Sequence, residues 1–132
     1  MSSDEGEDLF AQRFLPLLFC TYLSSVVVEE LYAGALDVQA IRLVERYAVA
    51  LERSSRVVVP TFKDWKKAGK LVAQLSRKEP SHKPKVQQML NDILIALCAR
   101  QIGGTLFTFN KGDFELICRY RPFSLKILNR KG

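Results

Sequence analysis

The fold is decided by residues Met89–Phe114, which read MLNDILIALCARQIGGTLFTFNKGDF. Good helix formers, with no glycine or proline, predict a helix over residues 86–102. Gly103 and Gly104 are expected to end it, because glycine accepts the left-handed conformation of a helix C-terminus at little cost. Thr105–Phe109 follows as a predicted strand, rich in β-branched and aromatic residues.

Two acidic residues of this stretch are candidate functional residues. Asp92 is the only charged residue between Met89 and Ala99, and a carboxylate buried alone is so costly that it needs a hydrogen-bond partner, a proton or a metal. Asp113 comes just after the strand, at the edge where an open α/β sheet presents its ligand groups. Structural roles stay open for both. Asp113 could cap a helix that begins at Phe114, and Asp92 could be protonated or bonded to the hydroxyl of Ser24, Ser25 or Thr108.

The rest of the chain predicts strands that alternate with helices. We expect a disordered acidic lead over residues 1–8 and one domain over 9–132. Expected helices cover 9–19, 26–34, 38–53, 62–77 and 113–120, and expected strands cover 22–23, 56–60 and 124–128. Ser24 or Ser25 is expected to cap the second of these helices, and Thr61 with Asp64 resembles a capping box. Trp65 and the phenylalanines are expected in the core. The alternation predicts an α/β fold with a parallel sheet.

The charge of the chain is concentrated in its second half. Residues 1–60 carry a net charge of −4 and residues 61–132 a net charge of +10, which together give the overall +6. This basic half fits a phosphate-bearing partner such as RNA or an acidic protein, and equally a solvated lysine face. The lysines that could contact nucleic acid are Lys63, Lys66, Lys67, Lys70, Lys83 and Lys85.

The composition is that of a cytoplasmic protein. No apolar run reaches the length of a membrane span, and the acidic N-terminus is unlike a secretory signal. The three cysteines are widely spaced in apolar surroundings and show neither a disulfide nor a zinc pattern.

Three motifs, in this order, resemble PIN domains, especially the VapC-type ribonuclease toxins. They are residues 23–35 (LSSVVVEELYAGA), 91–96 (NDILIA) and 105–114 (TLFTFNKGDF). The resemblance implies a three-layer α/β fold with a short parallel sheet flanked by helices. It also implies a divalent-metal-dependent endoribonuclease of a toxin–antitoxin pair, with RNA as substrate, a cognate antitoxin as partner and a homodimer as the assembly.

By the same resemblance, the acids that hold Mg²⁺ or Mn²⁺ and carry catalysis fall on Glu30, Asp92 and Asp113. Ser24, Ser25, Thr108 and Asn110 fall on polar positions around them. Hard cations held by carboxylates activate water and neutralise the charge that develops on phosphate, whereas the acids without a metal would repel one another.

The sequence departs from the family at its first acid. In the family that acid ends a first strand in an Asp-Thr-Asn-like motif, and no such tripeptide precedes Ser24. We therefore expect the first strand to be absent, through a start site assigned too late, a truncated or degenerate copy, or replacement of the strand by another segment or chain. Two alternatives follow: an inactive, shortened PIN-like protein, and a basic RNA-binding module without metal chemistry.

Overall fold

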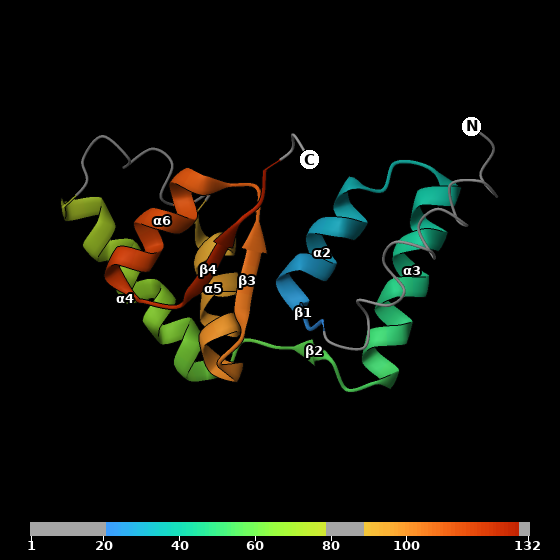
Figure 1. Ribbon diagram of the computed structural model, residues 1–132, viewed down its shortest axis with the longest axis horizontal. Helices are drawn as coiled ribbons and strands as arrows, with labels where there is room; N and C mark the ends of the chain where they lie inside the picture. The colour runs from blue at the N-terminus through green and yellow to red at the C-terminus, as the bar shows by residue number, and fades with distance from the viewer. Residues whose placement is uncertain (1–20, 79–88, 130–132) are drawn as a thin grey trace. The chain divides into compact units, whose positions relative to one another are not determined.

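The computed structural model describes residues 21–78 and 89–129. Residues 1–59 and 60–132 form two compact units, here called unit 1 and unit 2 (Figure 1). The expected acidic lead, the expected helix over 9–19 and the lysines Lys83 and Lys85 lie outside the described residues. In the described ranges, no helix has the length and apolar character needed to cross a membrane.

Unit 1 consists of two helices and one pair of short strands. Strand β1 (Leu23–Ser24) pairs in parallel with β2 (Val57–Val58), and helices α2 (Ser25–Gly34) and α3 (Val38–Arg53) connect them. Each helix begins at a side-chain cap. Ser24 Oγ accepts the Val26 backbone N–H at 3.1 Å, and Asp37 Oδ1 accepts that of Ala40 at 2.7 Å.

Unit 2 is built around helix α5 (Leu90–Ile102), which contacts α4 (Phe62–Lys78), α6 (Lys111–Tyr120) and strand β3 (Thr105–Thr108). All six residues from Ile93 to Cys98 are buried, so this helix has no solvent-facing side over nearly two turns. Strand β4 (Ser124–Ile127) lies parallel to β3, with Thr108 opposite Ile127, and α6 makes the crossover between them (Figure 1).

Several sequence predictions are confirmed. The chain is an α/β protein with parallel strand pairing, and α3 has the predicted bounds. Helix α5 ends at Gly103, whose φ of 63° is the left-handed conformation that glycine adopts without strain. The capping box is present: the Thr61 N–H donates to Asp64 Oδ2 at 3.0 Å, and the Asp64 N–H donates to Thr61 Oγ1 at 3.1 Å.

Two predictions are wrong. Trp65 is 51% exposed and Phe62 is 78% exposed, because the buried face of α4 is the narrow stripe of Asp64, Ala68, Leu71 and Leu75. Helix α6 begins at Lys111, two residues earlier than expected, because Asn110 caps it.

Candidate functional site

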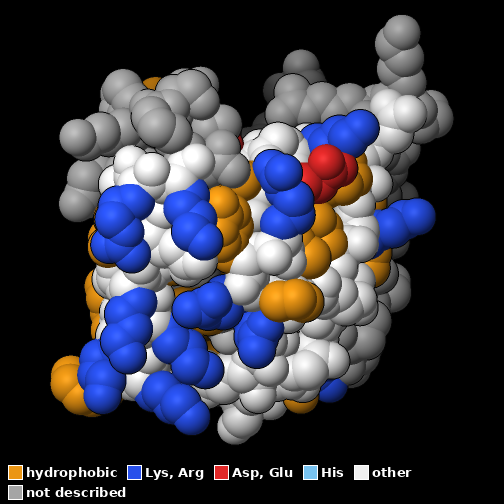
Figure 2. All heavy atoms as spheres, turned by 90° about the vertical axis from the view of Figure 1, so that its left-hand side faces the viewer, with side chains coloured by type: hydrophobic (Ala, Val, Ile, Leu, Met, Phe, Trp, Pro, Cys, Tyr) orange, Lys and Arg blue, Asp and Glu red, His pale blue; other side chains and the backbone are white. Residues whose placement is uncertain are grey.

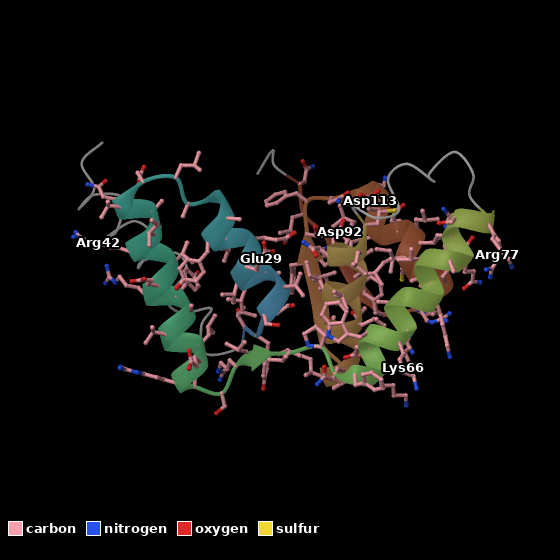
Figure 3. All side chains as sticks on the ribbon, turned by 180° about the vertical axis from the view of Figure 1, so that it is seen from behind. Glu29, Arg42, Lys66, Arg77, Asp92 and Asp113 are labelled. Carbon is pink, nitrogen blue, oxygen red and sulfur yellow. The ribbon has the colours of Figure 1, made fainter. Side chains whose placement is uncertain are left out.

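The carboxyl end of β3 brings two helix N-termini to the same end of unit 2. Helix α5 turns back into β3 through Gly103, so its first turn lies near the end of the strand. Helix α6 begins directly after β3, at Lys111. Asp92 lies in the first turn of α5 and Asp113 in the first turn of α6. Figure 3 shows both acids at this end of unit 2.

A chain of hydrogen bonds orders the segment from Thr108 to Asp113. The backbone N–H of Asn110 donates to Thr108 Oγ1 at 3.0 Å. The Asn110 side-chain amide donates to Asp113 Oδ2 at 3.4 Å, and Asn110 Oδ1 accepts the backbone N–H of Asp113 at 3.5 Å. Thr108 is itself held by the residue that follows β4, since its carbonyl oxygen accepts the Leu128 N–H at 2.7 Å. The Asp113 carboxylate is thus tied through Asn110 to the end of the sheet.

Both acids lie where a helix favours negative charge. The unpaired N–H groups and the dipole of a helix N-terminus stabilise a carboxylate in the first turn.

The predicted alternative, in which Asp113 itself caps a helix starting at Phe114, is wrong because Asn110 is the N-cap. The Asn110 amide donates to Oδ2, one of the two carboxylate oxygens of Asp113.

Asp92 is half-buried, and the six residues that follow it are fully buried. Asp92 has an interaction with another residue, and Glu30 separately has one of its own. The side chain therefore sits at the border between the apolar core and the polar end of unit 2. At this border a carboxylate keeps some contact with water while its helix stays fixed by packing.

The third predicted acid, Glu30, and the predicted serines Ser24 and Ser25 belong to unit 1. Ser24 ends β1 and caps α2, with Ser25 as the first residue of that helix. Glu30 lies in the middle of α2 and is exposed. Over residues 21–78 and 89–129, no group of three or more His, Cys, Asp or Glu side chains is placed to hold a metal ion. The three-acid site stays a prediction.

The predicted nucleic-acid contacts gather on α4. Lys63, Lys66 and Lys70 are exposed and Lys67 is half-buried. Figure 2 shows lysine and arginine side chains spread over the face formed by α4 and α6, with few acidic side chains among them. Sequence reasoning missed the exposed Phe62 and Trp65 on the same helix; their lysine neighbours at positions 63, 66 and 67 were the available signal.

The comparisons with known proteins agree with the motif order. The sequence profile of the PIN domain matches residues 3–120, which span both units. Neither the curated proteins nor the solved structures gave a significant match. Because the profile covers most of the chain, the protein belongs to the PIN domain family.

Proposed function

We propose that this protein is a divalent-metal-dependent endoribonuclease of the VapC toxin type, acting in the cytoplasm and held in check by a cognate antitoxin. Membership of the PIN family indicates a nuclease-type function with nucleic acid as the substrate. The observation that carries the proposal is that Asp92 and Asp113 lie in the first turns of two helices at one end of unit 2 (Figure 3).

The side chains at this end suit a hard cation. Carboxylate oxygens are the ligands that Mg²⁺ and Mn²⁺ prefer. Asp92 and Asp113 would be the direct ligands, and Glu30 would bind the metal or a water molecule on it. The bound metal would supply an activated water and neutralise charge on the phosphate.

Each residue then has a distinct task. Asp92 and Asp113 provide negative charge on short, rigid side chains whose helices are fixed by packing. Asn110 orients Asp113 through the 3.4 Å bond from its amide. Thr108 fixes the Asn110 backbone. Ser24 and Ser25 are proposed to face the substrate or the ligating acids.

The homodimer and the antitoxin are further parts of the proposal. In unit 1, α2 and α3 expose several large apolar side chains that a partner protein would cover: Leu31, Tyr32, Val38, Ile41 and Val49. Light scattering of the purified protein tests the homodimer. Co-purification with the product of an adjacent small gene tests the antitoxin.

A ribonuclease assay tests the activity. Wild-type protein is expected to cut RNA with Mg²⁺ or Mn²⁺ and to lose the activity in EDTA. Glu30→Gln, Asp92→Asn and Asp113→Asn should each abolish cleavage, whereas Glu115→Gln, an exposed acid of the same helix as Asp113, should not. Cleavage that persists in Asp92→Asn would contradict the site.

The alternative of an RNA-binding module without metal chemistry is favoured by one observation, the exposed aromatic and lysine side chains of α4. Such a module, like an inactive shortened PIN-like protein, would show no metal-dependent cleavage. It would bind RNA with an affinity that does not respond to Mg²⁺ chelation.

A further inference from the structure

The first two turns of α4 combine exposed aromatic rings with lysines. Phe62 is 78% exposed and Trp65 is 51% exposed, three residues apart on one helix and therefore neighbours on its surface. The Lys66 ammonium lies over the Phe62 ring, 5.4 Å from its centroid. Large exposed rings are unusual on a solvated lysine face, because exposing them to water has no benefit for folding.

The charge of the helix that carries the rings is strongly positive. Helix α4 contains five lysines and one arginine, and Asp64 is its only acid. Asp64 is 7% exposed and serves the capping box with Thr61. The outward side of α4 is thus basic from its first turn to Arg77 and Lys78 at its end.

Gly69 leaves the surface beside Trp65 open. It lies one turn after the ring, and a Cβ atom added there would meet nothing within 4 Å. Neither close packing nor a positive φ requires glycine at this position, yet glycine inside a helix is destabilising relative to alanine. Its absent side chain leaves room for a planar group to approach the ring.

We infer that the Phe62–Trp65 surface of α4, which is flanked by Lys63, Lys66 and Lys70, binds single-stranded RNA. Unpaired bases stack on the two rings, and the lysines bind the phosphates. Stacking on aromatic side chains is available to every base, and lysines follow the backbone without reading sequence. A duplex hides its base faces, so this surface selects single strands.

The Phe62–Trp65 surface lies away from the proposed site of cleavage, so it acts as an anchor, a place where RNA is bound but not cut. Figure 3 shows Lys66 at the end of unit 2 opposite to Asp92 and Asp113. The 17 residues of α4 extend about 25 Å between these ends. RNA held by its bases at Trp65 can run along the lysines toward the acids. The anchor deepens the proposed ribonuclease function, but it is defined by binding alone.

Trp65 reports binding directly, because it is the only tryptophan of the chain. Binding is measured with an unstructured RNA of about 12 nucleotides, in EDTA, on the Asp92→Asn protein so that no cleavage occurs. The expected result is quenching of Trp65 fluorescence by the single strand and much weaker binding of the matching duplex. Unchanged fluorescence on saturation, or equal affinity for the duplex, overturns the inference.

Variants separate stacking from charge. Trp65→Leu should weaken binding by about 5- to 150-fold, the usual effect of losing one stacked base, and Trp65→Phe should retain most of the affinity. Gly69→Gln keeps the ring, covers it and improves helix propensity; it should also weaken binding. Full affinity in Trp65→Leu or Gly69→Gln, with folding verified by circular dichroism, contradicts base stacking.

The lysines are tested by salt. Replacing Lys63, Lys66 and Lys70 together by glutamine should lower the slope of log affinity against log salt by about 2. Lys126→Gln, an exposed lysine on β4, is the matched control and should not change Trp65 quenching. An unchanged slope in the triple variant overturns the role of the lysines. Failure of the proposed nuclease function can be distinguished from failure of this inference. In that case wild-type protein binds RNA as expected but does not cleave it in Mn²⁺.

Discussion

Asn110 performs two tasks that can be separated by substitution. It caps α6 by accepting the Asp113 N–H, and it donates its amide to Asp113 Oδ2 at 3.4 Å. Asn110→Ala removes both. Asn110→Ser keeps a side-chain oxygen suited to an N-cap but has no amide to donate to Asp113.

The expected magnitudes follow from these two bonds. Loss of an N-cap costs about 1 kcal/mol, which lowers the melting temperature of a domain of this size by about 4 °C. Asn110→Ala should show this loss, and Asn110→Ser should remain within a few tenths of a kcal/mol of wild type. Loss of a group that orients a ligand typically costs about 10- to 100-fold in metal affinity or activity. Both variants should therefore lose ribonuclease activity by about this factor.

Thermal unfolding by circular dichroism and cleavage of a labelled RNA in Mn²⁺ measure the two effects. The diagnostic variant is Asn110→Ser, which is expected to be stable and poorly active. An Asn110→Ser protein with wild-type cleavage would refute the proposed orienting role of Asn110. An Asn110→Ala protein of unchanged stability would refute the capping role.

Three further predictions concern the fold. Thr61→Ala removes the acceptor of the 3.1 Å bond from the Asp64 N–H and should lower the free energy of unfolding by about 1 kcal/mol, with no loss expected in Thr61→Ser. Gly103→Ala places a Cβ atom at a φ of 63° and should cost about 1 kcal/mol, measured by urea denaturation; an unchanged midpoint would contradict this. Leu71→Ala empties a site that is 0% exposed and should cost about 3 kcal/mol, and a loss below 1 kcal/mol would show that α4 does not pack as described.

Features set by neighbouring residues were predictable from the sequence. The capping box of Thr61 and Asp64, the N-cap at Ser24 and the end of α5 at Gly103 depend on hydrogen bonds and dihedral angles within four residues. These local interactions leave few alternatives. The start of α6 was also predictable from neighbouring residues, although it was predicted two residues too late. Asn110 followed three residues later by Asp113 carries the N-cap pattern in the sequence.

Features set by packing were less predictable. Trp65 has the size and apolarity of a core residue, but the buried stripe of α4 is narrow and passes beside it. Whether a borderline position of an amphipathic helix is covered depends on the neighbouring elements, which the pattern of one helix does not contain. The three-acid site stays a prediction for the same reason, since Glu30 belongs to unit 1 whereas Asp92 and Asp113 both belong to unit 2.

The most direct test of the metal site is the effect of Mn²⁺ on thermal stability. A ligand that binds only the folded protein stabilises it by about 2.7 kcal/mol at 100 times its dissociation constant. We predict that Mn²⁺ raises the melting temperature of wild type and of the matched control Glu115→Gln, and that Asp92→Asn and Asp113→Asn lose this increase along with RNA cleavage. An equal increase in all four proteins, or none in wild type, would contradict metal binding by Asp92 and Asp113.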